Sequence, residues 1–408
     1  MVPRLLFACL VALVGLQAAE PAHATLAGKV VCGYQGWFRA EGDASGQGWV
    51  HYGPGKRFAP GACGIELWPD LAEFTPEERF ASPFRFADGQ PAELFSSVHP
   101  LTVRRHFRWM KDYGIDGAML QRFAVGLGKG RGAEALDTVL RHCIDSANAE
   151  GRSLTVMYDL TGLKPERFPT VSADWQKLLA AGLTKHPCYQ HHGGKPLVSL
   201  WGLGFKDRPA AAGEWQTLLK EIKATGAAVM LGVPSYWREG KADAWADPEV
   251  RAVIRQGDIV SPWAVGRFGR PSEVAGYAKK VWQPDVQACA ETKQDYLPVI
   301  FPGFSWHNLS ALRGQQAPFD QIPRLGGQLL WKQAIEAKQA GAKMVYVAMF
   351  DELDEGTAIM KCGGPRPTGA SPFLDLSDVP TDHYLWLTGQ IGRMVRGEIA
   401  PTPAPPKR

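Results

Sequence analysis

A repeated alternation of short apolar runs and amphipathic segments constrains the fold of this chain more than any other feature. Several of the runs are nearly continuous apolar stretches, as expected for strands buried on both faces. They lie at 30–34, 117–121, 154–158, 196–201, 228–233, 259–263, 297–301 and 344–350. The segments between them carry apolar residues at helical spacing, at 103–113, 133–149, 174–183, 214–224, 273–290 and 324–340. Strands that alternate with helices in this way are parallel and joined by right-handed crossovers.

Eight such units predict an α/β fold, a closed (β/α)8 TIM barrel. The alternative is an open doubly wound sheet, which usually has fewer strands and often a glycine-rich nucleotide loop. The chain contains neither GxGxxG nor GxxxxGK[ST]. Its length of 408 residues would by itself suggest two or three domains. The repeat instead predicts one domain over residues 25–397, with a long insert at 39–100 after the first strand. That position puts the insert at the carboxyl face of the barrel, where we expect part of the substrate cleft.

Both ends of the chain differ from the barrel. Residues 1–24 combine Arg4, a short apolar run and Ala22-His23-Ala24, the pattern of a secretory signal peptide cleaved near Ala24. We therefore expect a secreted or periplasmic protein, and export permits one or two disulfides. The sequence assigns no pairing among the remaining cysteines, which are Cys32, Cys63, Cys143, Cys188, Cys289 and Cys362. The Pro-rich tail at 398–408 is predicted to be disordered.

The charge balance excludes some classes of partner. The chain has 45 basic and 41 acidic residues and no basic block, so a nucleic acid is not expected. No later stretch has the length and apolarity of a membrane span. The near-neutral net charge fits an uncharged glycan.

Aromatic side chains gather at the predicted strand ends. In a barrel the residues at strand carboxyl ends face the active site, and seven of the eight ends here carry an aromatic residue. A sugar has an apolar face that stacks on an aromatic ring and hydroxyls that bind polar groups. For any single ring, a place in the core is about as probable on residue type alone. The candidate substrate-binding residues are Trp37, Trp49, His51, Arg122, Tyr158, Asp159, Trp201, Tyr236, Trp263, Trp306, His307, Asp351 and Asp354.

The sharpest motif follows the last predicted strand. Asp351, Glu352, Asp354 and Glu355 occur within five residues. Clustered carboxylates raise one another's pKa, so one can stay protonated near neutral pH. An acid and a base side by side are what glycosidic cleavage requires. A calcium loop is the less favoured interpretation because DxDxDG-type alternation is absent, and a solvated acidic turn is the other.

Two further types of site have weaker support. A histidine-rich segment contains His186, Cys188, His191 and His192, but its spacing matches no common zinc pattern and it precedes a strand. We therefore predict no metal site. A Ser-His-Asp hydrolase is not supported, because no GxSxG elbow occurs.

The segment 348–357, Ala-Met-Phe-Asp-Glu-Leu-Asp-Glu-Gly-Thr, resembles the last strand of the family 99 glycoside hydrolases. These are the endo-α-mannosidases and endo-α-mannanases, with a pattern of roughly [SF]-F-N-E-W-H-E-G-T. Residues 33–38, Gly-Tyr-Gln-Gly-Trp-Phe, and 48–52, Gly-Trp-Val-His-Tyr, are similar to that family's first strand and the tryptophan–histidine segment after it. The similarity extends over most of the chain after residue 24.

The resemblance implies a (β/α)8 barrel that cleaves α-linked glycans with retention and needs no metal or organic cofactor. It implies that Glu352 is the base on the substrate 2-hydroxyl, giving a 1,2-anhydro-sugar intermediate. It implies that Glu355 is the acid and then the base at the leaving oxygen and the incoming water. The family's Asn, Trp and His are Asp351, Leu353 and Asp354 here. This difference leaves open a family 71-like α-glucanase, a hydrolase of xylan or arabinan, and a glycan-binding barrel without turnover.

Overall fold

The strands of the chain form a ring. The structure, a computed structural model, describes residues 23–54, 57–208 and 212–408. Neighbouring parallel strands pair in the order β10, β9, β8, β7, β5, β4, β1, β12 and β11. Their bounds are β1 Val30–Tyr34, β4 Gly117–Phe123, β5 Ser153–Asp159, β7 Lys195–Trp201, β8 Ala228–Pro234, β9 Ile259–Trp263, β10 Asp295–Tyr296, β11 Val299–Ile300 and β12 Val345–Val347.

The ring closes through one interrupted strand. β10 pairs with β9 and β11 pairs with β12, and only Leu297 and Pro298 separate the two pieces. The Leu297 amide donates to the Val260 carbonyl at 2.9 Å, and the Tyr346 amide donates to the Pro298 carbonyl at 3.0 Å. Pro298 has no N–H to continue a ladder, which explains the break. Counting this strand once, the described chain forms eight parallel strands, and the predicted (β/α)8 barrel is confirmed.

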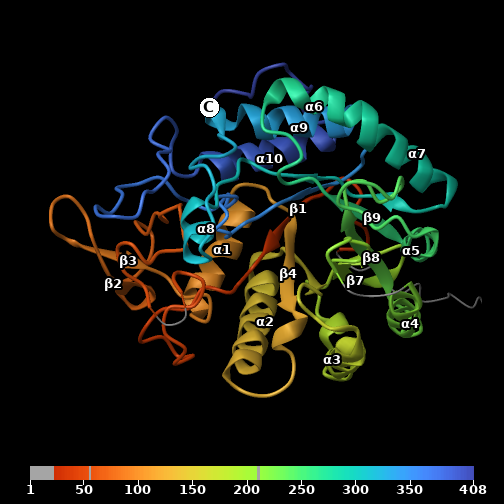
Figure 1. Ribbon diagram of the computed structural model, residues 1–408, viewed down its shortest axis with the longest axis horizontal. Coiled ribbons are helices and arrows are strands. Elements are labelled where there is room, and N and C mark those ends of the chain that lie inside the picture. Colours follow the sequence, from red (N-terminus) through yellow and green to blue (C-terminus); the bar gives the residue numbers. More distant parts are fainter. Residues whose placement is uncertain (1–22, 55–56, 209–211) are drawn as a thin grey trace, which may run out of the picture.

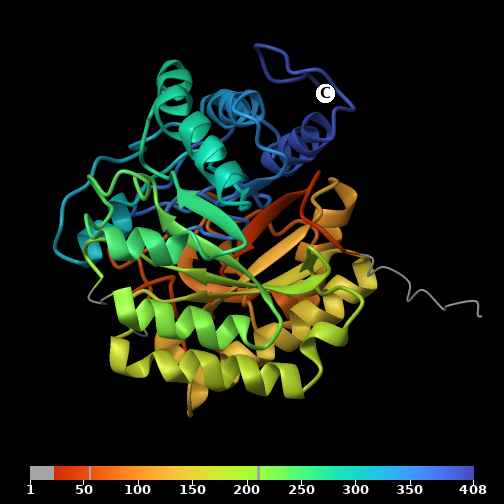
Figure 2. The ribbon, with the colours of Figure 1, turned by 90° about the vertical axis from the view of Figure 1, so that its right-hand side faces the viewer.

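Helices surround the ring, as Figures 1 and 2 show. The predicted segment 273–290 consists of two helices joined by a π-helical turn, Ala278–Trp282. Three of the described helices were not predicted: a short one between β8 and β9, a short one in the loop after β11 and a long one after the last strand. The bounds are α1 Pro100–Asp112, α2 Arg131–Glu150, α3 Phe168–Ala180, α4 Ala212–Lys223, α5 Pro248–Ile254, α6 Pro271–Tyr277, α7 Gln283–Glu291, α8 His307–Leu312, α9 Gln328–Gln339 and α10 His383–Val395.

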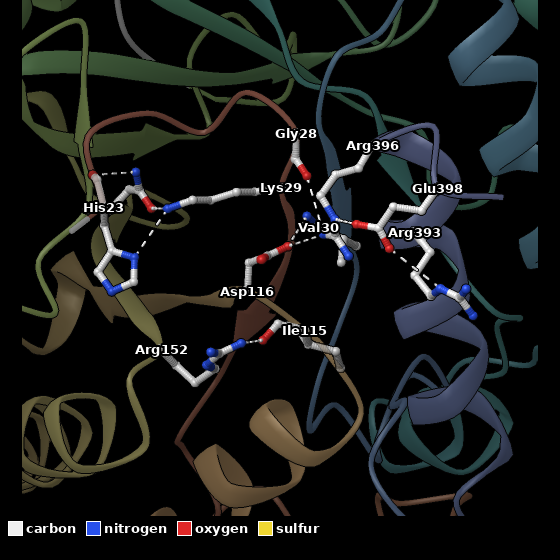
Figure 3. Close-up of polar contacts among 11 residues, drawn as sticks. His23, Gly28, Lys29, Val30, Ile115, Asp116, Arg152, Arg393, Arg396 and Glu398 are labelled. Carbon is white, nitrogen blue, oxygen red and sulfur yellow. Dashed lines mark hydrogen bonds and ion pairs between the residues drawn. The ribbon is translucent and has the colours of Figure 1, made fainter.

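The amino end of the barrel is held by polar contacts between distant segments (Figure 3). Asp116, just before β4, accepts the Val30 amide at 2.8 Å and lies 3.4 Å from Arg396, which follows α10. Lys29 donates to the Gln190 side chain at 2.9 Å. These contacts join the first strand, β4 and the last helix at the face opposite the strand carboxyl ends, which is typically the stability face of a barrel.

The insert at 39–100 packs against the barrel instead of forming a separate layer. It contains an antiparallel hairpin, β2 Phe80–Arg85 and β3 Pro91–Leu94, at the left of Figure 1. Its aromatic residues lie in the same hydrophobic core as the strands. A second short pairing joins β6, His191–His192, to β7 in antiparallel fashion.

The Pro-rich tail, predicted to be disordered, lies against α9 and α10, where Trp331 donates to the Thr402 carbonyl at 2.7 Å and Arg408 pairs with Asp382 at 2.7 Å. The predicted signal peptide falls almost entirely outside the described residues.

The one or two disulfides that the sequence allows are not formed, because all six described cysteines are free and buried. They are dispersed through a core that needs no cross-links. Across the described ranges, no helix has the length and apolarity to cross a bilayer.

Candidate active site

The acidic turn after β12 is held by three segments from other parts of the chain. The Glu66 amide of the insert donates to the Leu353 carbonyl at 3.0 Å, and the Ser305 amide donates to the Glu355 carbonyl at 3.0 Å. The buried guanidinium of Arg324 donates to the carbonyls of Gly356 and Ala358 at 2.8 and 2.6 Å. The turn is therefore fixed on both sides by hydrogen bonds, as a site that must hold two carboxylates in register requires.

Glu66 also connects two of these holding segments. Its buried carboxylate accepts the Ser305 hydroxyl and the Asn308 amide, the latter at 2.7 Å. Burial raises the pKa of this carboxyl, and the two donors oppose the rise. Glu66 thus ties the insert to the loop after β11 directly beneath the acidic turn.

Glu352 is buried and accepts two side-chain hydrogen bonds. Gln35 Nε2 lies 2.5 Å from Oε1, and Thr357 Oγ1 lies 2.5 Å from Oε2. Burial raises the pKa of Glu352 well above its usual value, and the nearby charges of Glu355 and Asp354 raise it further. The two donors favour the charged form of this carboxylate over the neutral form.

Glu355 is less buried than Glu352 and faces open space. Burial and the neighbouring Asp354 raise its pKa to about 7, and Arg313 opposes this rise. No described residue donates a hydrogen bond to its carboxylate. The charge of Glu355 raises the pKa of Glu352, so the two carboxyls titrate as a coupled pair. The donors from Gln35 and Thr357 stabilise a negative charge on Glu352 rather than on Glu355.

Asp351 is fully buried and faces the first strand. Its two oxygens accept the backbone amides of Gln35 at 2.7 Å and Gly36 at 2.9 Å, and burial raises its pKa to about 7. Asp351 therefore positions the end of β1, and with it the side chain of Gln35 that reaches Glu352.

A cleft of about 720 Å³ opens beside Glu355. Its lining comes from the first strand end, the insert, the start of α2, α8 and the acidic turn. The lining residues are Trp37, Gly46, Gln47, Val50, His51, Gly53, Pro54, Gly64, Arg131, Leu309, Leu312, Arg313, Asp354 and Glu355.

An aromatic stack forms one wall of this cleft. The rings of His51 and Trp37 are parallel within 8° with centroids 3.8 Å apart, and Phe123 stacks on Trp37 at 5.1 Å. His51 Nδ1 lies 3.4 Å from Oδ2 of the buried Asp354. His51 has a φ of 64°, a conformation uncommon outside glycine that clusters at functional sites. Trp37, His51 and Asp354, three of the sequence candidates, are thus brought together with Glu355.

Other candidates lie at the mouth of the barrel but not in this cleft. Trp201 and Trp263 meet edge to face at 5.2 Å, and Arg208 lies over the Trp201 ring at 4.9 Å. Asp159 accepts the Thr161 amide at 2.7 Å, and its pKa is raised by burial. Tyr236 packs against the core, with Lys241 at 5.6 Å from its ring. Trp201 and Trp263 form a second aromatic group at the ends of β7 and β9.

Arg122 and Tyr158 point toward the helices. Arg122 donates to Asp174 at 2.6 and 2.7 Å and to Asp137 at 2.6 Å, and Tyr158 donates to Asp174 at 2.7 Å. Both acids come from helices, Asp137 from α2 and Asp174 from α3. The network fastens these helices to β4 and β5.

The remaining candidates have local partners. Trp49 is 2% exposed in the core of the insert, packed on Tyr52 and Phe58. Trp306 donates to the Gln321 side chain at 3.1 Å, and His307 Nδ1 lies 2.7 Å from the Ala317 carbonyl. None of the three lines the cleft.

The histidine-rich segment is not assembled as a metal site. His192 pairs with Asp295 at 2.8 Å, and the Cys188 thiol lies 3.8 Å from the Ile144 carbonyl. Within the part of the chain that the structure describes, no group of three or more His, Cys, Asp or Glu side chains is placed to hold a metal.

Sequence reasoning missed several residues of the site. Gln35 and Thr357 contact Glu352, and Arg131 and Arg313 line the cleft. Gln35 could have been predicted, because it follows the predicted strand 30–34 and lies in the segment 33–38 that resembles the family motif. Arg313 follows a short helix in a loop, so no pattern in the sequence marked it.

Comparison with known proteins supports the fold. No protein-family model matches the chain, and no curated protein matches it in sequence. Two solved structures of the GH99 endo-α-mannosidase from Bacteroides thetaiotaomicron superpose on it with a TM-score of 0.66 and 17% sequence identity. The complex with BIS-TRIS propane covers 92% of this chain and 99% of its own, and the other structure covers 91% and 99%. The chain therefore has the barrel fold of that glycoside hydrolase over nearly its whole length, as the resemblance predicts.

Proposed function

We propose that this protein is a secreted or periplasmic glycoside hydrolase that cleaves α-linked glycans with retention, in the manner of an endo-α-mannosidase. The observation that carries the proposal is the pair Glu352 and Glu355. The two carboxyls occupy a turn fixed by hydrogen bonds at the carboxyl end of the last strand, and burial raises the pKa of both. Glu355 lines a cleft that has an aromatic wall, as a sugar substrate requires.

The chemistry that the resemblance implies suits this arrangement. Glu352 takes the proton of the substrate 2-hydroxyl, and the 2-oxygen attacks C1. Glu355 gives its proton to the leaving oxygen, which releases the shortened glycan and a 1,2-anhydro sugar. Glu355 then takes a proton from water as that water attacks C1, and Glu352 returns its proton to the 2-oxygen. The two displacements at C1 give net retention and consume one water.

The stereochemistry of this route favours an α-mannoside. Displacement by the 2-oxygen must come from the face opposite the leaving oxygen. In an α-mannoside both C1–O and C2–O are axial and on opposite faces, so the attack is aligned. In an α-glucoside the two oxygens lie on the same face, which prevents it.

The test is a screen of α-mannans, α-glucans, xylan and arabinan fragments, with products followed by NMR. We expect α-mannan cleavage with an α-configured first product. Glu352→Gln and Glu355→Gln should each lower turnover by about 10²–10⁴-fold while glycan binding remains. Glu77→Gln, an exposed acid of the insert, is the matched control and should keep full activity.

Two outcomes would contradict the proposal. Full turnover by either glutamine variant would remove the assignment of that residue. Glycan binding by the wild-type protein without product from any substrate would favour a binding protein that has lost turnover.

Export has its own measurement. N-terminal sequencing of the protein recovered outside the cytoplasm should begin at Thr25. A chain that keeps residues 1–24 would contradict cleavage at Ala24.

A further inference from the structure

Two arginines face the cleft from different sides. Arg131 is the first residue of α2, and Arg313 follows α8. Both line the cleft that Glu355 also lines. The positive charge of Arg313 also acts on the acidic turn. It lowers the pKa of Glu355, whereas burial and Asp354 raise it.

Neither arginine has an acidic partner among the residues that the structure describes. Arg131 donates to the Gly46 carbonyl at 3.2 Å, and no ion pair joins Arg131 or Arg313 to a described carboxylate. Elsewhere in the described chain, Arg122 pairs with Asp174 at 2.6 Å and Arg267 with Asp243 at 2.6 Å. The two cleft arginines, in contrast, have charge left for a ligand.

The acids of the cleft do not neutralise this charge. Among the described lining residues the acids are Asp354 and Glu355. Asp354 already faces His51 at 3.4 Å. Glu355 must carry a proton to act as the acid, and its pKa of about 7 permits this in neutral or acidic solution. With Glu355 protonated, the cleft lining holds two arginines and one other acid, Asp354, and the positive end of the α2 dipole lies at Arg131.

We propose that the glycan bound in this cleft carries an anionic group, a carboxylate, sulfate or phosphate, held by Arg131 and Arg313. The inference rests on the proposed function in taking the ligand to be a glycan. A guanidinium presents paired N–H donors that match the oxygens of these anions in bidentate fashion. Because Arg313 lines the same cleft as Glu355, the proton donor, the anionic group belongs to the part of the glycan near the leaving oxygen.

The net charge of the chain differs from the charge that this ligand would meet. The near-neutral total, which fits an uncharged glycan, includes many arginines and lysines whose charge is cancelled locally by an acid. The charge that a ligand meets is that of the cleft lining, where the arginines are unpaired.

The test measures binding by calorimetry with the Glu352→Gln protein, so that turnover does not interfere. Three matched pairs of probes identify the anion. They are a phosphodiester-bearing α-mannan before and after dephosphorylation, a sulfated α-mannan before and after desulfation, and an α-linked uronan before and after carboxyl reduction. We expect at least one anionic member to bind about tenfold to a hundredfold tighter than its neutral partner, with a preference that weakens as salt is added.

Arginine variants give the matched comparison. Arg131→Gln and Arg313→Gln, each made in the Glu352→Gln protein, should remove the preference and leave the affinity for the neutral partner unchanged. Arg141→Gln, which changes an exposed arginine of the same helix outside the cleft, should keep the preference.

The inference would be overturned if each charged glycan bound with the same affinity as its neutral partner. It would also be overturned if the arginine variants lost affinity equally for the charged and the neutral glycan. Binding of no glycan at all would also overturn it. If wild-type protein cleaves nothing but the charge preference is present, the proposed function fails and this inference stands.

Discussion

The side-chain amide of Gln35 lies 2.5 Å from Oε1 of Glu352, although 317 positions separate the two residues in the chain. The Gln35 backbone amide is at the same time bound by Asp351 at 2.7 Å. One acid of the acidic turn, Asp351, thus fixes the end of the first strand so that the side chain of Gln35 can reach the next acid, Glu352.

Gln35→Leu should lower turnover without weakening glycan binding. It removes one of two donors from Glu352, which raises the pKa of the proposed base further, and Gln35 does not line the cleft. We expect kcat to fall about tenfold or more, KM to stay unchanged and the acidic limb of the pH–rate profile to move to higher pH. Gln47→Leu, in the cleft lining, is the control and should not move that limb. An increase in KM alone for Gln35→Leu would contradict this role.

Glu355→Gln should make folding stability less dependent on pH. The folded pKa of Glu355 is about 7 against an ordinary value of 4.5, so its contribution to stability is fully present below 4.5 and is lost as pH rises through 7. The variant should therefore gain on the wild type by about 3 kcal/mol between pH 4.5 and 8. Urea unfolding at several pH values measures the difference, and Glu77→Gln should show none. A constant difference at all pH values would exclude a buried acid at position 355.

His51→Phe and His51→Ala should separate stacking from charge. Both remove the Nδ1 contact with Asp354, so its charge acts more strongly on Glu355 and the alkaline limb of the pH–rate profile moves up. The shift should stay below about one pH unit because the His51 side chain is 37% exposed. The phenylalanine keeps a ring over Trp37, so only the alanine variant should raise KM. A higher KM in both variants would assign the contact with the glycan to the imidazole nitrogens.

Arg122→Gln should destabilise the fold and leave the chemistry intact. The substitution removes the cationic partner of Asp174, whose side chain is 10% exposed, and leaves the Tyr158 hydroxyl as its donor. We expect a loss of about 1–3 kcal/mol, whereas Arg122 does not line the cleft. Chemical unfolding gives the stability, and kcat and KM per folded molecule should match the wild type. Arg141→Gln is the matched control. A large rise in KM with normal stability would instead support the predicted role of Arg122 in substrate binding.

Much of the fold could be predicted because the strands are buried on both faces. The predicted ranges 30–34 and 259–263 coincide with β1 and β9. The predicted range 344–350 is too long, because β12 ends at Val347 and the chain then enters the acidic turn. The helix α10 was missed because it follows a stretch without periodicity after the eighth strand. Its packing is nonetheless close, since a Cβ at Gly389 would lie 1.8 Å from the Tyr113 carbonyl.

The site could be predicted only where its residues are neighbours in sequence. Four acids after a strand mark the turn, and the resemblance of 348–357 to the family motif selects Glu352 and Glu355 among them. The contacts of Gln35, the stack of His51 on Trp37 and the positions of Arg131 and Arg313 depend on which loops meet above the barrel. Some aromatic residues of the strand ends line the cleft, some form the second aromatic group and some lie in the core. The residue type alone does not determine which of these places a side chain occupies.

Glu66 has a consequence for how this barrel can be altered. Its carboxylate accepts hydrogen bonds from Ser305 and Asn308 in and after the loop that follows β11, and its backbone amide donates to the Leu353 carbonyl of the acidic turn. The insert that carries it is therefore not a modular loop that can be exchanged or shortened to change specificity, as other loops of such barrels can. Recombination between relatives would have to exchange residues 39–100 together with 304–308 and 351–358, so these segments are expected to change as one unit.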